Sequence, residues 1–343
     1  MKKIKYLVLT CFCSALIGQT KAQDIHFSQI EFSPTMMNPA YTGLFQGKMR
    51  AIANYKNQWL ALGSTFQTFG ASIDGKIKKP TWKNFALGLG GYFFSDFAGD
   101  AKLGSTDGIF SVSSMIKVGP KSTLSIGING GFGYYSIDAS AMRWGDQYDG
   151  EGGYDPSTTS MDFFTVDPFF NWDVGAGVAY SYRKSETTLS SKDQMGFDLG
   201  FSVSHINKPN LQFGDVGERK YMKFLFSGMG VLGIKNSNLT LYPSLMAAFQ
   251  RPTNEILLGI RMKYAFQEAS RVTGYIKEHG LILGAYHRFN DALIFSLGYQ
   301  YTDFTLNLSY DINLSKLSPA TSARGGLEIA LQYILEKSLY CKN

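Results

Sequence analysis

The sequence predicts an all-β fold, a transmembrane barrel of the outer-membrane type closed by 14 antiparallel strands. The first observation is the stretch 293–310, where apolar residues occupy every second position in two runs separated by Thr302 and Asp303. Side chains on an extended chain point to alternate faces, so this stretch is a hairpin with one apolar and one polar face. The second observation is that strands of about ten residues, long enough to cross a bilayer when tilted, recur along the chain.

The third observation concerns what the chain lacks after residue 22. No window holds eighteen uninterrupted apolar residues, while Gly (37), Phe (26) and Tyr (20) are abundant. In hydrocarbon every backbone amide needs a partner within the protein, and a sheet satisfies that condition only by closing on itself. These observations exclude a bundle of spanning helices and favour a barrel.

The strands follow from the alternation, taken in order. Besides the 293–310 hairpin we expect them at 49–58, 66–76, 84–95, 108–118, about 124–129, 172–183, 197–203, 224–234, 239–249, 256–264, 281–287 and 327–333. The total of 14 is even, as single-chain bacterial barrels require. With both barrel ends in the periplasm, parity places the 138–170 loop and the 204–210 connection outside the cell. The connections 184–194 and 266–279 are long for periplasmic turns, so a register that differs by one hairpin is the alternative there.

The N-terminus resembles a secretory signal. Lys2, Lys3 and Lys5 precede a short apolar run, and Thr20-Lys21-Ala22 provides small residues for cleavage, so we expect a signal peptide over 1–22 and a mature chain from Gln23. The alternatives are a membrane anchor, for which the run is short, and a lipoprotein modified at Cys11.

Cleavage changes the charge and the cysteine count. It removes four of the 33 basic residues and none of the 27 acidic ones, leaving a net charge of +2, and only Cys341 of the three cysteines remains. An internal disulfide is therefore excluded, and nothing suggests a nucleic-acid partner.

Two segments do not alternate. Residues 23–48 contain Pro34, Pro39 and Gly43, and we expect an ordered non-strand segment that either plugs the lumen or lies along the periplasmic rim, with the barrel following over 49–343. Residues 138–170 form a long acidic loop, and such loops are normally functional. Its carboxylates suggest calcium, although Asp146 to Glu151 lacks EF-hand spacing. Its aromatic residues favour contact with a partner instead.

Three stretches resemble a known family. His26-Phe27-Ser28-Gln29, Asn38-Pro39-Ala40-Tyr41-Thr42-Gly43 and Asn57-Gln58-Trp59 are similar to the N-terminal signature of PorP/SprF outer-membrane proteins. Residues 310–317 and 325–329 resemble its closing motif, and 166–182 with 204–210 resemble its middle. Ile25 and Lys56 stand where the family usually has proline and arginine.

The resemblance implies a component of the type IX secretion system of Bacteroidota, in the outer membrane of a Gram-negative cell. Such a barrel works with a large secreted adhesin, through the adhesin's C-terminal domain, and supports its export or surface attachment, linked to gliding motility or adhesion. Other secretion components and outer-membrane lipid are further expected partners. The alternative is a channel for small or hydrophobic molecules, with 23–48 as its hatch.

Catalysis is not expected. The four histidines, at 26, 205, 279 and 287, have no metal-ligand spacing, and the chain has no GxSxG elbow and no Walker A loop. We expect no cofactor apart from the calcium alternative. The candidate partner-binding residues are taken from the N-terminal segment, the acidic loop and the closing motif: His26, Phe27, Ser28, Asn38, Pro39, Ala40, Gln58, Trp59, Trp144, Tyr148, Tyr154, Phe163, Tyr310, Asp311 and Glu328.

Overall fold

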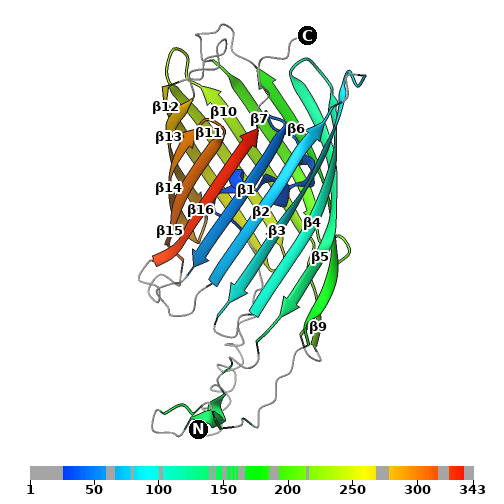
Figure 1. The fold of residues 1–343 in the computed structure, drawn as a ribbon, viewed down its shortest axis with the longest axis vertical. Coiled ribbons are helices and arrows are strands. Elements are labelled where there is room, and N and C mark those ends of the chain that lie inside the picture. Colours follow the sequence, from blue (N-terminus) through cyan, green and yellow to red (C-terminus); the bar gives the residue numbers. More distant parts are fainter. Residues whose placement is uncertain are drawn as a thin grey trace, which may run out of the picture.

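A computed structural model places the strands in a closed barrel (Figure 1). It describes residues 26–58, 66–78, 81–99, 103–138, 167–184, 193–213, 216–267, 278–315 and 324–335, with short stretches between 142 and 160. The expected signal peptide, Trp59 and Phe163 lie outside the described residues. No helix among the described residues is long and apolar enough to cross a membrane.

Fourteen antiparallel strands form the wall, so the predicted fold class and strand number are confirmed. They are β1 (Met49–Gln58), β2 (Phe66–Ile77), β3 (Phe85–Ala98), β4 (Leu103–Lys117), β5 (Ser122–Ser136), β6 (Phe169–Lys184), β7 (Met195–Ser204), β10 (Lys223–Gly233), β11 (Leu239–Gln250), β12 (Thr253–Gln267), β13 (His279–Arg288), β14 (Ala292–Tyr301), β15 (Phe304–Asn313) and β16 (Arg324–Leu335). β1 pairs with β16 over ten residues and closes the cylinder.

The register fixes the tilt of the strands. Following paired residues from Tyr55 through β2 to β5 leads to Phe170 on β6. The opposite route round the barrel leads to Lys184, 14 residues further along β6. A shear of one residue per strand corresponds to a tilt of about 35–45° from the barrel axis.

The outer surface of the barrel is apolar. On β14 Phe295 and Leu297 are about half exposed, whereas the intervening Ser296 is buried inside. The same alternation runs along β6, where Trp172, Val174 and Val178 point outward. Each strand of this closed wall pairs with a neighbour on both sides, which supplies partners for the backbone within the bilayer.

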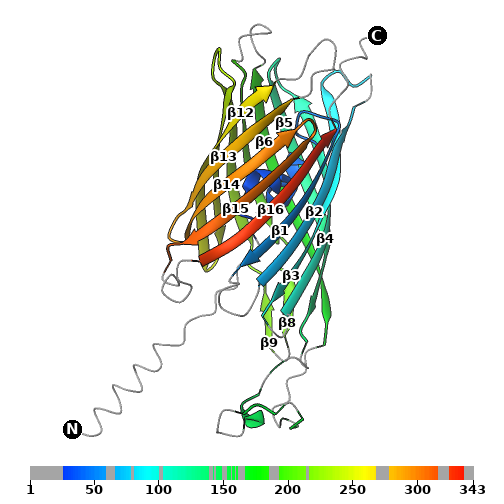
Figure 2. The same ribbon diagram turned by 60° about the vertical axis from the view of Figure 1, so that its left-hand side comes forward.

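The two barrel ends differ (Figure 2). We call the end that carries the 234–238 and 302–303 connections the turn end. The opposite end carries the 137–168 connection and the chain between β7 and β10, and we call it the loop end. The predicted long connections 184–194 and 266–279 fall at the turn end, and the strands that flank each of them are direct neighbours in the wall, β6 beside β7 and β12 beside β13.

The chain between β7 and β10 forms a feature that the sequence did not predict. β8 (Asn210–Phe213) and β9 (Val216–Arg219) pair as a separate two-stranded sheet at the loop end. Strands of four residues are too short to establish an alternating pattern, so the sequence predicts only the 204–210 connection at this point. β6 also begins at Phe169, three residues before the predicted start.

The inner face of β15 is polar, as predicted, but it is buried and not exposed to water. Asn307, Ser309 and Asp311 are 0–2% exposed. They are covered by residues 26–48, which are seen through the wall inside the barrel (Figure 1). Of the two predicted placements of the N-terminal segment, the described residues therefore occupy the lumen, and we call residues 26–48 the plug.

Candidate functional site

The plug is compact because prolines divide it into single turns. η1 (Ile30–Phe32), α2 (Pro34–Met37) and η2 (Pro39–Tyr41) follow one another, and proline opens both of the latter two. Proline lacks a backbone N–H and has a fixed φ, so it suits the first position of a helix and not its interior. Asn38 caps η2, since its Oδ1 accepts the Ala40 N–H at 2.8 Å. The plug therefore crosses the lumen in short, sharply bent steps.

Glycines in the wall let the plug backbone approach the strands directly. A Cβ on Gly127 would lie 2.4 Å from Ala40 N, and one on Gly88 would lie 2.1 Å from Thr42 O. A Cβ on Gly177 would lie 2.1 Å from Asn38 Oδ1. The backbone contacts at Gly127 and Gly88 are too close for any side chain, so these two positions require glycine, while Gly177 leaves room for the Asn38 amide.

Asn38 and Tyr41 bind the plug to β6, β7 and β10. Asn38 Nδ2 donates to the carbonyls of Val178 and Phe201 at 3.1 and 3.3 Å. The Tyr41 hydroxyl contacts Ser227 Oγ at 2.8 Å. Burial raises the pKa of this hydroxyl above its ordinary value, because the phenolate would lose its hydration. Tyr41 therefore stays a neutral hydrogen-bonding group.

We expect Asn38→Ala to weaken this attachment. The substitution removes both bonds to wall carbonyls and the η2 cap, which together should lower the free energy of unfolding by about 2–4 kcal/mol. Urea unfolding of the refolded barrel in detergent measures the effect. Asn57→Ala, near the rim of β1, serves as the control and should change it by less than about 1 kcal/mol.

A buried ion pair holds the plug near the turn end. Arg50 on β1 binds Asp74 on β2 through two hydrogen bonds of 2.9 and 2.7 Å. Asp74 also accepts the Gly43 N–H at 2.7 Å, and Arg50 donates to the Tyr41 carbonyl. Gly43 has φ +71°, a conformation that favours glycine. Both members of the ion pair thus also form hydrogen bonds with the plug backbone.

A second group of buried charges holds the start of the plug. Glu328 on β16 accepts the backbone N–H groups of Ser28 and Gln29 at 2.7 and 3.2 Å. Lys56 pairs across the ladder with Glu328 and donates to the His26 carbonyl at 2.9 Å. Both charged residues are at most 2% exposed.

Asp311 extends this group. It binds Arg288 at 2.7 Å and accepts the Ser28 hydroxyl at 2.8 Å. Gln29 adds a bond to Ser309 at 2.9 Å. Because unpaired buried charges are strongly unfavourable, these residues stabilise one position of the segment relative to the wall.

The middle of the plug packs on an apolar part of the lumen. Ile30 and Met37 lie in a buried cluster with Leu257 and Ile294 from β12 and β14. Glu31 turns toward Arg261, 3.2 Å away, and accepts the Tyr286 hydroxyl at 3.1 Å. The hydrophobic core of this protein therefore lies inside the barrel, between plug and wall.

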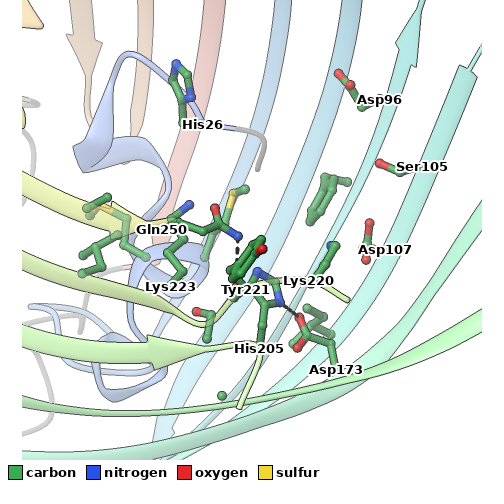
Figure 3. A pocket seen from close by; sticks show the side chains of 18 of the residues that line it. His26, Asp96, Ser105, Asp107, Asp173, His205, Lys220, Tyr221, Lys223 and Gln250 are labelled. Carbon is green, nitrogen blue, oxygen red and sulfur yellow. Dashed lines mark hydrogen bonds and ion pairs between the residues drawn. The ribbon is translucent and has the colours of Figure 1, made fainter. Parts of the chain in front are cut away.

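A cavity of about 350 Å³ remains between the plug and the loop end (Figure 3). Ile30, Met36 and Met37 of the plug contribute to its lining. His205 lies 2.8 Å from Asp173 on one side, and Gln250 donates to the Tyr221 carbonyl on another. Asp96 and Asp107 lie across from Lys223 in this view. The volume is within the range of small-ligand sites.

The structure separates the sequence-predicted site residues into two groups. Ser28 meets Asp311 and Glu328, so the opening and closing motifs are in direct contact. Phe27, Asn38, Pro39 and Ala40 are buried, so they present no docking surface in this structure. His26 lies 3.6 Å from Glu255 at the cavity, while Gln58 ends β1 and Tyr310 faces outward.

The acidic loop lies apart from the plug. Tyr148 and Tyr154 form a β-bridge with ring centroids 5.3 Å apart, and Trp144 precedes a 3-10 turn at Gly145–Gln147. Asp146 accepts a hydrogen bond from Ser160. Bonds from Ser157 hold the pKa of Asp155 below its ordinary value, and Asp149 and Glu151 lie outside the described residues. The described residues contain no group of three potential metal ligands, and calcium binding by the whole loop stays a prediction.

Sequence reasoning missed most of the charged residues that hold the plug. Arg50, Asp74, Arg261 and Arg288 stand at inward positions of amphipathic strands. A charged side chain at such a position can bind a buried partner or face water in an open lumen. The sequence alone does not distinguish these two cases. The wall glycines were equally ambiguous, because glycine is frequent throughout the chain.

The fold and the amphipathic wall define the class: this is an outer-membrane β-barrel with an internal plug. The sequence profile described as "Type IX secretion system membrane protein PorP/SprF" matches residues 19–333. The chain belongs to this family, which confirms the resemblance and the outer-membrane location. No curated protein sequence matches the chain.

Solved structures share the fold at low similarity. The TodX monoaromatic hydrocarbon channel deltaS2 mutant is 9% identical, with a TM-score of 0.45 over 88% of this chain and 93% of that one. A Pseudomonas aeruginosa FadL homologue is 12% identical, with a TM-score of 0.44 over 87% and 93%. CdiB from Acinetobacter baumannii is 9% identical, with a TM-score of 0.40. The aligned region covers 83% of this chain and 60% of the CdiB chain. None of these similarities carries an argument about function.

Proposed function

We propose that this barrel acts in type IX secretion by binding one secreted protein at its loop end and supporting that protein's export, its attachment to the surface, or both. The observation that carries the proposal is the filled lumen. The plug is bonded to wall strands on opposite sides of the barrel, through Glu328 on β16 at its start and through Asn38, which donates to carbonyls of β6 and β7. A partner of protein size therefore has no passage through this barrel, which supports recognition at the loop end instead of transport through the lumen.

The partner's expected chemistry comes from the family. A large adhesin, recognised through its C-terminal domain and used in gliding or adhesion, fits a protein that offers aromatic and acidic loops outside the membrane. Other components of the secretion system are further candidates for contact at the rim. The mechanism is binding without a chemical step.

Deleting the gene in its host tests this function. We expect one secreted protein to disappear from the cell surface and other secreted proteins to remain, because recognition is specific. Quantitative mass spectrometry of surface-exposed and released proteins provides the measurement. Unchanged export and display of every such protein would contradict the proposal.

The second candidate is a channel, favoured by the cavity of about 350 Å³ at the loop end. If the plug is a hatch, deletion of residues 23–48 should raise conductance from near zero to a steady open level in planar bilayers. The intact chain is the reference. A trace that remains closed after the deletion, with the barrel still folded, would rule against a channel.

A further inference from the structure

One strand of the wall has an open edge at the loop end. β6 pairs with β5 from Phe169 onward, but its pairing with β7 begins only at Ala176. Residues 169–175 therefore have a barrel strand on one side only. β8 begins nearby but pairs with β9 alone.

Hydrogen bonds show which backbone groups face the open side. Val174 O accepts the Ile206 N–H at 3.0 Å, and Val174 N donates to Asn207 Oδ1 at 3.2 Å. Trp172 O accepts from Asn207 Nδ2 at 2.5 Å. Backbone groups alternate along a strand, so those of Phe170 point the same way. Among the described residues, the N–H and C=O of Phe170 and the N–H of Trp172 have no hydrogen-bond partner across this edge.

The side chains beside this edge are the most exposed large apolar groups of the described chain. Trp172 is 73% exposed and Phe170 is 69% exposed. The Phe170 ring lies 4.9 Å from that of Tyr134 on β5, centroid to centroid. Tyr134, Phe170 and Trp172 thus form an exposed aromatic surface beside the edge.

The register places Phe170 at the loop-end border of the apolar band. Phe170 is five strands from Tyr55 along paired residues, and the shear of one residue per strand raises it by about five residues, roughly 13 Å, toward the loop end. Asn57 and Gln67, two and three residues above Tyr55, are polar, and Phe97 and Tyr134 are outward aromatic residues about one residue below Phe170. Aromatic residues are typical of this border, where the backbone leaves the hydrocarbon.

We propose that this edge, Phe170 to Trp172, binds an extended strand of the secreted partner by strand addition. The open N–H and C=O of Phe170 and the open N–H of Trp172 can be complemented by another strand, while lipid tails offer no hydrogen bonds. Apolar residues at alternate positions of the added strand would pack on Phe170 and Trp172. This inference rests on the proposed function and specifies its mode of binding.

The test compares two substitutions at one position in the host cell. Phe170→Pro removes the edge N–H and the ring, and proline is tolerated on an edge strand. Phe170→Ala removes the ring alone. We expect Phe170→Pro to reduce surface display of the protein lost in the gene deletion by about tenfold, and Phe170→Ala by about threefold. Heat-modifiable migration on gels verifies that both variants fold.

Photo-crosslinking identifies what occupies the edge. A benzoylphenylalanine replacing Trp172 should crosslink a strand of that same secreted protein, and one replacing the lipid-facing Val178 should not. Adducts only to lipid, to a second copy of this chain, or to its own 139–166 loop would overturn the inference. So would normal display in Phe170→Pro when the gene deletion abolishes display, whereas normal display in the deletion itself would overturn the proposed function instead.

Discussion

Gly127→Val is expected to dislodge the plug and destabilise the whole barrel. The Cβ of any side chain at this position would lie 2.4 Å from the backbone of Pro39 and Ala40. The plug must then withdraw from β5, which breaks the 2.7 Å bond from Ser125 Oγ to the Ala40 carbonyl and strains the Asn38 contacts. Overpacking and the lost bonds should together lower the free energy of unfolding by about 3–5 kcal/mol.

Gly130→Val is the matched control on the same strand. Gly130 faces outward, and an added Cβ would come no closer than 3.8 Å to Asp173 O. Valine favours strands, so this variant should unfold within about 0.5 kcal/mol of the parent. Urea midpoints in the same detergent compare the three proteins. Equal loss in both variants would mean that β5 itself, and not the plug contact, is sensitive.

Glu328→Ala is the second substitution with a large expected effect. It leaves the Ser28 and Gln29 N–H groups buried without an acceptor, and removes the carboxylate opposite Lys56. Loss of one member of a buried charge group typically costs about 3–5 kcal/mol, because the remaining charge stays in the interior. The start of the plug should detach first, since Glu328 holds it there.

A double-mutant cycle separates this charge effect from lost packing. Lys56→Met removes the remaining cation, so the double variant should be more stable than the sum of the single losses predicts by at least about 1 kcal/mol. Unfolding free energies of the four proteins give the coupling. Additive losses would show that Glu328 stabilises the plug through its hydrogen bonds alone.

The sequence was sufficient for the barrel. Alternation over 293–310 and its repeats predicted the apolar exterior and the strand number, because lipid imposes a two-residue period on every strand. The motifs at 38–43 and 325–329 further indicated the family, which the profile over residues 19–333 confirmed. The short strands β8 and β9 could not be predicted in this way, because they lie outside the barrel wall and lipid imposes no alternating pattern on them.

The contacts inside the barrel could be recognised only from the tertiary structure. Asp311 and Glu328 could equally have faced water in an open lumen, and only the path of residues 26–48 shows that they bind Ser28, about 300 positions away in sequence. The same holds for Gly127 and Gly88, whose necessity appears only when the plug backbone lies against them. Lipid contact is a local property of each strand and can be inferred from neighbouring residues, whereas contact between a plug and its wall depends on which distant segments the closed barrel brings together.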